Sequence, residues 1–269
     1  MSPRLWRVPR DLLWPTPYPL PRDTAAELME HDGETENLGL KMDRLLPYGS
    51  GRQGPELVHE FVDRGALVPD TAPLADLVEG WRLRWERLAA SVSAATFTAS
   101  PEWRSLVGLG TNALLQGGIT LHHLYGLPFI PAKALKGATR LYAEVVLDTP
   151  GEEVARLFGR TEGEARRGEL LFLDGVPAAP PRIERDLMNP HYAIYYGGQD
   201  NVPPGDYLSP TPVFLLVVGK GSPYRFGVAS LQGNRQDAER ATEWLKSALG
   251  EVGVGAKTAA GYGYWVVEG

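Results

Sequence analysis

Residues 253–263 hold the residue types best suited to binding an anion. The stretch reads Gly-Val-Gly-Ala-Lys-Thr-Ala-Ala-Gly-Tyr-Gly, so glycines surround Lys257 and Thr258. Glycine adopts positive φ readily and lets a backbone approach a ligand closely. Consecutive free N–H groups in such a loop form an anion-binding concavity, to which the Lys257 ammonium adds a full charge. The predicted ligand of this glycine-rich loop is a phosphate, and the alternative is a turn that binds nothing.

Two nucleotide-binding motifs do not fit this loop. A P-loop requires glycine immediately before its Lys-Ser/Thr pair, whereas Ala256 precedes Lys257. The P-loop and the dinucleotide fingerprint also follow a strand and open a helix. Here a helical pattern precedes the loop, and a short apolar run, Trp265 to Val267, follows it. An extended phosphate backbone therefore fits better than a mononucleotide held at a helix N-terminus.

A second cationic feature lies near the middle of the chain. Two prolines predict an extended lead-in and then a helix from Ala132 to about Leu147. At about 100° per residue, Lys133, Lys136 and Arg140 fall in one narrow sector, the basic stripe. Without an acidic partner these like charges repel one another by roughly a few tenths of a kcal/mol per pair, which an anion would relieve. The alternative is a solvated basic face. The predicted buried stripe of this helix consists of Leu135, Tyr142 and either Val145 or Val146.

A third candidate is the long segment 177–209, which is rich in Pro, Gly, Asn and Tyr. Its centre reads Asp-Leu-Met-Asn-Pro-His-Tyr over 186–192, followed by a Tyr pair at 195–196. Long loops are usually functional or disordered, and this aromatic content is wrong for disorder. We expect an ordered excursion in which residues 186–196 contact RNA or a neighbouring subunit. A metal held by Asp186 and His191 is less favoured, because the flanking residues suit turns and base stacking equally well.

The histidines do not form a recognisable catalytic site. His122 and His123 lie on an expected extended segment, 119–125, where adjacent side chains point to opposite faces. Acid–base cleavage of RNA needs a general base and a general acid placed around the 2′-OH and the leaving oxygen. Neither these two histidines nor His191 lies beside a partner that the sequence identifies. We therefore expect no catalytic residue, no metal and no cofactor.

Composition places the protein in a broad class. A chain of 269 residues can form one elaborated domain or two small ones. The net charge of −6 argues against indiscriminate nucleic-acid binding but leaves room for a local basic track. Cysteine is absent, which excludes disulfides and thiolate metal sites. Without a secretory signal or a run of about eighteen apolar residues, we expect a cytoplasmic protein with no membrane contact.

The elements that position these candidates follow from periodicity. Predicted helices cover 74–90, 132–147 and 236–249, and Gly250 is expected to cap the last of them. Predicted strands cover 91–98, 103–108, 169–173, 212–219, 224–231 and 265–267, and the strand at 212–219 is expected to be buried on both faces. Residues 157–168 are expected to form a loop. From about residue 103 the order is the βαββαβ plan of ferredoxin-like or RNA-recognition-motif domains. The predicted fold class is α+β. Residues 1–100 form an N-terminal arm and elaboration packed on a core at 101–269, which carries the insertion at about 177–209.

Three segments resemble one known family. The run Tyr-Gly-Leu-Pro-Phe-Ile-Pro at 125–131, with Leu-Lys-Gly at 135–137 and Arg140, resembles the conserved core of the RAMP superfamily of CRISPR proteins. The closing glycine-rich loop does so too, and the 186–196 run looks like the sixth subunit of the type III-B Cmr effector complex. The resemblance covers roughly 107–264. It departs at 132–134, where this chain has Ala-Lys-Ala and the family commonly has Gly-Ser-Ser. We expect the start of the helix to stay intact and a backbone contact to RNA to change.

The resemblance implies a noncatalytic subunit that binds guide RNA and caps the complex near the guide's 3′ end. Its implied partners are the guide (CRISPR) RNA, target RNA, other RAMP backbone subunits and the small helical subunit. Target cleavage then belongs to the repeated backbone subunit, and nucleotide chemistry to the large subunit. Two alternatives are a RAMP-type endoribonuclease that trims guide precursor with a histidine, and a phosphate-handling metabolic enzyme.

The predicted RNA contacts come from the loop, the stripe and the excursion. They are Gly253, Gly255, Lys257, Thr258, Gly261, Tyr262 and Gly263; Lys133, Lys136 and Arg140; and Asn189, His191 and Tyr195. The two helices of a βαββαβ fold lie side by side on one face of the sheet. We therefore expect the loop and the stripe to form one phosphate-binding surface.

Overall fold

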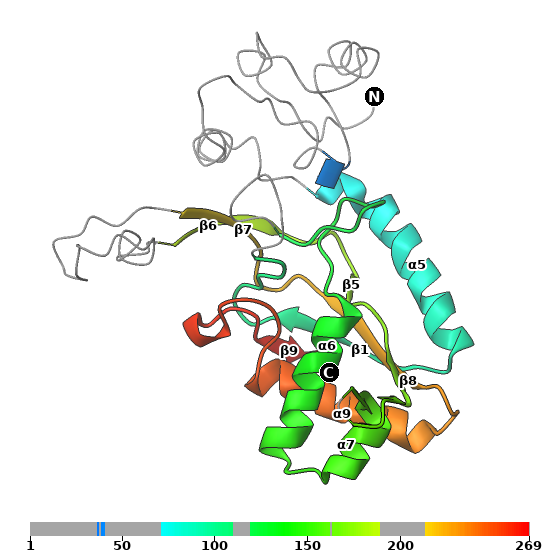
Figure 1. Cartoon of the computed structure of the whole chain (residues 1–269). Coiled ribbons are helices and arrows are strands. Elements are labelled where there is room, and N and C mark those ends of the chain that lie inside the picture. Colours follow the sequence, from blue (N-terminus) through cyan, green and yellow to red (C-terminus); the bar gives the residue numbers. More distant parts are fainter. Residues whose placement is uncertain are drawn as a thin grey trace, which may run out of the picture.

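The computed structural model describes residues 37, 39–40, 71–109, 119–161, 163–188 and 213–268. Most of the expected N-terminal extension lies outside these ranges, as do Asn189, His191 and Tyr195. Within them the protein is a mixed α/β structure with antiparallel sheets (Figure 1). None of the helices in this described part has both the length and the apolar composition needed to cross a membrane.

The main sheet has five strands in the described part of the chain. They are β1 (Ala95–Pro101), β4 (Leu170–Phe172), β5 (Val176–Pro177), β8 (Tyr224–Ser230) and β9 (Trp265–Val267). The order is β4-β8-β1-β9, with β5 also paired to β8, and all pairs are antiparallel. In this register Phe97 lies opposite Phe226. Strands distant in sequence are therefore neighbours, with β1 and β8 at the centre.

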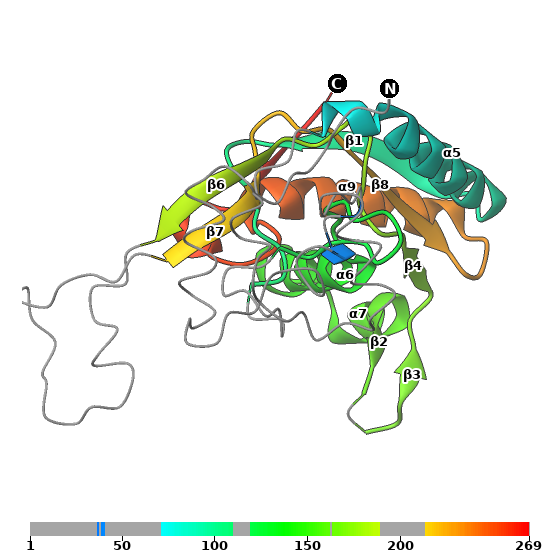
Figure 2. The ribbon, with the colours of Figure 1, turned by 90° about the horizontal axis from the view of Figure 1, so that it is seen from above.

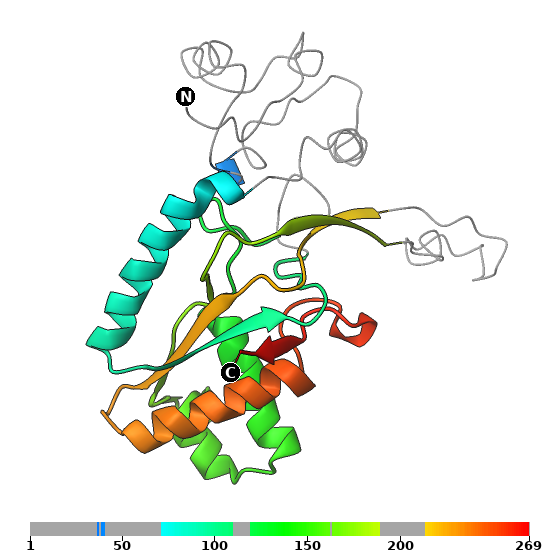
Figure 3. The ribbon, with the colours of Figure 1, turned by 180° about the vertical axis from the view of Figure 1, so that it is seen from behind.

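Two helices cover one face of this sheet. They are α6 (Ala132–Leu141), which continues as the π-helical turn η2 (Tyr142–Val146), and α9 (Arg235–Glu251). The two helices pack against each other; α9 also packs against β8 and β1, and α6 packs against β4 (Figure 3). The expected helices at 132–147 and 236–249 are thus confirmed.

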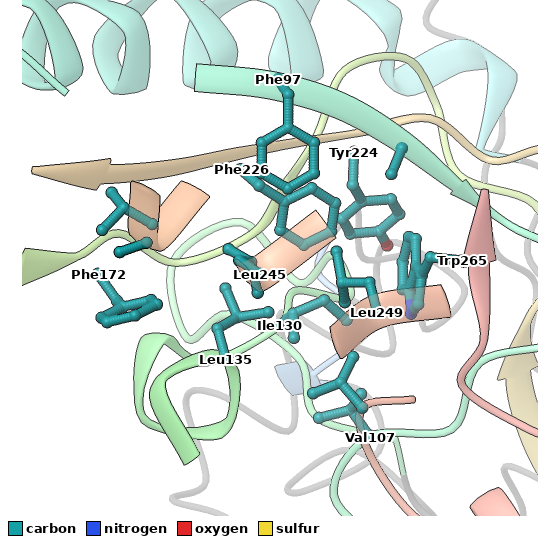
Figure 4. Close-up of a cluster of buried hydrophobic side chains, with 14 of the residues drawn as sticks. Phe97, Val107, Ile130, Leu135, Phe172, Tyr224, Phe226, Leu245, Leu249 and Trp265 are labelled. Atoms are coloured by element: carbon teal, nitrogen blue, oxygen red, sulfur yellow. The ribbon is translucent and has the colours of Figure 1, made fainter. Parts of the chain in front are cut away.

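The largest core cluster lies between these helices and the sheet (Figure 4). Tyr224, Phe226 and Val228 all enter it from β8, because alternate residues of a strand share a face. The Phe226 ring lies 5.3 Å from the ring of Phe97 and meets Trp265 edge-on at the same separation. Helices contribute Leu135, Leu245 and Leu249.

The opposite face of the sheet is covered by α5 (Ala75–Ser91), which follows the short turn η1 (Ala72–Leu74) (Figure 2). Trp85 packs over Gly227 of β8, where an added Cβ would lie only 3.2 Å from the indole. The indole Nε1 also donates a 2.8 Å hydrogen bond to the Asp174 carbonyl. This helix confirms the expectation for 74–90 and places the sheet between two helical layers.

The expected loop at 157–168 is wrong. The chain forms α7 (Gly151–Phe158) and then the hairpin of β2 (Gly159–Arg160) and β3 (Arg166–Arg167). The helix had its signals in the sequence: two acidic residues in its first turn and buried Val154, Leu157 and Phe158 at helical spacing.

A second antiparallel pair of strands begins inside the expected ordered excursion at about 177–209. It consists of β6 (Ile183–Met188) and β7 (Val213–Val218). The expectation for 212–219 is confirmed, and residues 215–218 are all buried as predicted. The strand β6 was not predicted, because its charged alternation resembles a polar loop.

Residues 103–108 are not a strand. Ser105 exchanges two 2.9 Å backbone hydrogen bonds with Val218, while the carbonyls of Arg104 and Leu106 accept N–H groups from the glycine-rich loop. The segment is thus bonded alternately to two different parts of the chain. The first strand of the main sheet is β1, which precedes it.

Two local predictions on the helices also fail. Val145 and Val146 are exposed, because η2 widens the helix and its Leu147 N–H bonds five residues back to Tyr142. Gly250 lies inside α9, and Gly253, at φ 76°, ends the helix by donating to the Ala248 carbonyl.

Candidate nucleic-acid interface

The glycine-rich loop is held in place by its own main chain. Val254 N–H donates to the Gly263 carbonyl at 2.8 Å, and Ala256 N–H donates to Leu106 at 2.7 Å. Gly263 N–H in turn donates to the Arg104 carbonyl at 2.8 Å. The N–H groups of Val254, Ala256 and Gly263, which were expected to be available to a ligand, are thus already hydrogen-bonded within the protein. The anion site is therefore smaller than predicted.

The remaining donors gather around Lys257. Among the described residues, the N–H groups of Gly255, Lys257, Thr258 and Ala259 have no hydrogen-bond acceptor. Lys257 is left-handed, at φ 62° and ψ 32°, and the right-handed turn η3 (Thr258–Ala260) follows it. Such a change of hand aims consecutive N–H groups at one point, which favours an anion. The Lys257 side chain is exposed and has no ion-pair partner in the described ranges.

The glycines of the loop are required by its own packing. Gly255 has φ 111°, and an added Cβ would lie 2.4 Å from the Leu106 carbonyl oxygen. Gly263 has φ 77°, with the Val254 oxygen at 2.3 Å from such a Cβ. Gly261, at φ 92°, has only the Trp103 ring near it, at 3.9 Å. The prediction of positive φ is confirmed. At Gly255 and Gly263, however, glycine is required by close contacts with the protein's own backbone rather than by a ligand.

Tyr262 lies in the interior rather than at a surface. Its side chain is 5 % exposed, and its hydroxyl donates a 2.6 Å hydrogen bond to Asp186. Burial and the neighbouring carboxylate raise the pKa of Tyr262 to about 12. The ring is thus not free to stack on a base, whatever the loop around it binds.

Asp186 contacts its own chain, which corrects the expectation for this end of the excursion. Besides Tyr262, it binds Arg104 at 3.0 Å, and Arg104 also binds Glu184 at 3.1 Å. This network joins β6 to the glycine-rich loop. In the described part of the chain, no group of three or more acidic or histidine side chains is placed to hold a metal ion.

The basic stripe has fewer free charges than predicted. Arg140 does have an acidic partner at i+4, since its Nε lies 2.7 Å from Glu144, and it also donates to the Gly159 carbonyl. Lys133 is exposed and Lys136 is half-buried, and neither has an ion-pair partner among the described residues. The stripe thus keeps two lysines that an anion could neutralise.

Lys136 is the less solvated of these two lysines. Burial, together with the nearby charges of Arg140 and Arg167, lowers the pKa of its ammonium. Arg167, exposed on β3, was not predicted as part of this patch, because the hairpin that carries it was expected to be a loop. An anion bound here would offset the repulsion among the three cations.

The loop and the stripe belong to two helices that pack together. Tyr142 at the end of α6 donates a 3.3 Å hydrogen bond to Glu251 at the end of α9. Among the described residues, no hydrogen bond or ion pair joins the loop to Lys133, Lys136 or Arg140. That they form one surface stays a prediction.

His122 belongs to an aromatic cluster. Its ring lies 4.9 Å from Trp81, 4.7 Å from Tyr125 and 5.6 Å from Phe129. Burial lowers the pKa of His122, and its Nδ1 accepts the Leu124 N–H at 3.2 Å. The imidazole is therefore packed and partly used by the turn that carries it.

Gly137 offers a test of the exposed face of α6. An added Cβ there meets nothing within 4 Å, and φ is helical, so Gly137→Ala should stabilise the protein by about 0.5–1 kcal/mol. Urea unfolding measures this change. Gly227→Ala, which crowds Trp85, should instead destabilise. A loss of stability in Gly137→Ala would contradict the open surface.

Comparison with known proteins supports the family resemblance that was argued from three segments of the sequence. Residues 105–267 match the RAMP superfamily. The CRISPR system Cmr subunit Cmr6 of Pyrococcus furiosus is 32% identical, over 64% of this chain and 68% of that protein. The CMR subunit Cmr6 of Saccharolobus solfataricus is 27% identical, over 62% and 55%.

A solved structure shares the fold. A chain of the type III-B Cmr-beta complex bound to cognate target RNA superposes with a TM-score of 0.60 at 20% identity, over 92% of this chain and 86% of that chain. This chain therefore belongs to the RAMP superfamily of CRISPR proteins, as a relative of the Cmr6 subunits of type III-B Cmr complexes.

Proposed function

We propose that this chain is a noncatalytic, RNA-binding structural subunit of a type III-B CRISPR complex, which binds the guide RNA backbone and caps the complex near the guide's 3′ end. The observation that carries the proposal is the set of free N–H groups at 257–259 beside the exposed Lys257. Backbone donors bind phosphate without reading a base, as a guide of variable sequence requires.

The fold supports this assignment. The order β4-β8-β1-β9, with α6 and α9 on one face, fits a ferredoxin-like βαββαβ plan, and we propose that classification. We also propose the division into an N-terminal part, 1–100, and a core, 101–269. Because β1 crosses that boundary, the N-terminal part would supply most of a central strand to the core sheet.

The proposed partners are guide RNA, target RNA, other RAMP backbone subunits and the small helical subunit, all in the cytoplasm. The Cmr-beta complex whose chain shares this fold is bound to cognate target RNA, which supports this set. Asn189, His191 and Tyr195 stay proposed contacts to RNA or to a neighbouring subunit. They lie between the end of β6 and the start of β7.

The packing of His122 favours binding over cleavage. An endoribonuclease needs a histidine poised to accept or donate a proton at the 2′-OH. Within the described ranges, neither His122 nor His123 is hydrogen-bonded to a carboxylate, and His122 is enclosed by aromatic rings. We therefore propose that bound RNA stays intact.

The test replaces Lys257 and Lys136 with alanine. Affinity for single-stranded RNA should fall equally for all sequences. The slope of log affinity against log salt concentration should become shallower by roughly 0.7 for each lysine removed. Fluorescence anisotropy across a salt series measures both. The matched control is Arg235→Ala, since Arg235 is exposed at the other end of α9 and pairs with Glu239.

Two results would count against this function. Wild-type affinity and salt slope in both lysine variants would mean that the loop is only a turn. Cleavage of labelled guide precursor by repurified protein, with or without Mg²⁺, would favour the endoribonuclease. Intact but shifted precursor is the expected result.

A further inference from the structure

Trp103 is a large aromatic side chain left at the surface. It is 43% exposed, although the other described tryptophans on the sheet and on α5, Trp81, Trp85 and Trp265, are at most 6% exposed. Tryptophan is enriched at binding interfaces, because it offers a large apolar ring with a polar N–H group. Trp103 is therefore the aromatic residue in the described ranges that is best placed to meet a ligand.

The protein holds this ring in a fixed position. On one side of it in the chain, Glu102 N–H donates to Tyr264 at 2.9 Å, and on the other the Arg104 carbonyl accepts from Gly263 at 2.8 Å. The buried Tyr262 ring lies 5.0 Å from the indole. A side chain that is already ordered loses little conformational entropy when it binds.

Arg104 lies over one face of the indole. Its guanidinium carbon lies 5.0 Å from the ring centroid, and Glu184 and Asp186 hold the guanidinium at about 3 Å. Arg104 is thereby committed to protein partners. It orders the ring and is not itself the RNA contact.

The exposed ring adjoins the phosphate-binding part of the loop. Gly261 lies against it, with an added Cβ 3.9 Å from the indole. Gly261 N–H donates to the Thr258 carbonyl at 2.9 Å, and Tyr262 N–H donates to Lys257 at 3.3 Å. Lys257 and Thr258, whose N–H groups are free, are thus hydrogen-bonded through their carbonyls to the two residues that contact Trp103.

We propose that Trp103 stacks on a base of single-stranded guide RNA whose adjacent phosphate is bound at Lys257, Thr258 and Ala259. The proposal rests on the function proposed above and adds a base-binding position to it. Stacking on an aromatic ring tolerates any base, because every base has a π-face. The site would bind a guide RNA of any sequence through both a backbone phosphate and a base.

The surroundings of Trp103 favour RNA over a protein partner. Protein hot spots are enclosed by apolar contacts that exclude water. Here the ring stands beside free backbone donors and an unpaired lysine, which suit a phosphate. The larger apolar surface in the described part lies elsewhere, on Leu141, Val145, Val146 and Leu147.

The test uses the full chain and a labelled single-stranded RNA of mixed sequence. Trp103→Ala should weaken binding about 5- to 150-fold, the equivalent of about 1–3 kcal/mol per stacked base, without changing the salt slope. Trp103→Phe should keep most of the affinity, while Trp103→Leu, which is apolar but has no π-face, should behave like alanine. Thermal unfolding of each variant confirms that it is folded.

A second RNA, identical in backbone but abasic, isolates the stacking contribution. Wild-type protein should bind it more weakly, and Trp103→Leu should bind both RNAs alike. Equal affinity of wild type for the two RNAs, or unchanged RNA affinity in Trp103→Leu, overturns the proposal, even if that variant fails to assemble with other subunits. The lysine variants distinguish failure of the stacking proposal from failure of the proposed function. A reduced salt slope in Lys257→Ala would support RNA binding by the loop even if Trp103 does not stack on a base.

Discussion

Valine in place of Gly255 is expected to destabilise the protein by about 2–4 kcal/mol. Gly255 has φ 111°, where a β-branched residue is strained, and its Cβ would lie 2.4 Å from the Leu106 carbonyl oxygen. The loop would have to move, which breaks the bond from Ala256 N–H to that same oxygen. Equilibrium unfolding in urea measures the loss.

A second glycine separates strain from crowding. Gly221 has φ 71° but nothing within 4 Å of an added Cβ. Gly221→Val should therefore cost only about 1–2 kcal/mol, the cost of a left-handed residue alone. If the two valine variants were equally stable, the close approach of the loop to Leu106 would be wrong.

Arg156→Met is expected to cost about 2–3 kcal/mol at neutral pH. Arg156 on α7 binds Asp237 and Glu169, each at 2.7 Å, and so joins α7 to α9 and to the segment before β4. Asp237 is nearly buried, so removing the guanidinium leaves a poorly solvated carboxylate that keeps only the weaker partners Arg240, at 3.1 Å, and Asn234. The loss is below that of a fully buried pair, because Arg156 is 31% exposed. Urea unfolding again provides the measurement.

The pH dependence of that loss tests its cause. The hydrogen bond from Arg156 holds the pKa of Asp237 below its usual value. A depressed carboxylate pKa stabilises the fold above the unfolded-state value, and this contribution disappears as pH falls through the folded-state pKa. The gap between wild type and Arg156→Met should therefore shrink below about pH 4.

The control for this pair is an arginine that binds only at the surface. Arg235 is 86% exposed and pairs with Glu239 one turn away. Arg235→Met should change stability by less than about 0.5 kcal/mol at any pH. A gap for Arg156→Met that stayed constant into the acid range would rule out Asp237 as its source.

Strongly periodic segments could be predicted from the sequence. The stripe of Ala238, Ala241, Leu245 and Ala248 is buried along α9 as expected. Such segments repeat one local pattern over several turns, so burial on a single face is enough to define them. The same holds for α5, which buries Val78, Trp81, Trp85 and Ala89 along one face.

Local departures from ideal geometry could not be predicted. The period of 3.6 residues that places Leu135 and Tyr142 in the core also places Val146 there, but η2 changes the rotation per residue and leaves it 50% exposed. At 103–108 the apolar composition favours a strand. The partners of that segment, β7 and the glycine-rich loop, are more than a hundred residues away in sequence, and they decide its structure.

The candidate site was predicted in part for the same reason. Glycine spacing alone indicated positive φ and a loop, and both are present at Gly253, Gly261 and Gly263. Which N–H groups stay free depends on Arg104 and Leu106, which no local pattern links to the loop. The burial of Tyr262 against Asp186 and the exposure of Trp103 likewise depend on tertiary contacts.

The strand order of the main sheet has a consequence for biosynthesis. β1 has β8 and β9 as its two neighbours, and the pair Ala95 and Val228 is separated by 133 residues, 228 minus 95. Contacts of such high sequence separation form late and slowly. On the ribosome both edges of β1 stay open until more than two hundred residues have emerged, and open strand edges promote aggregation. Fragments that end before β8 should thus depend on chaperones, which makes β8 the element that any shortened version must retain.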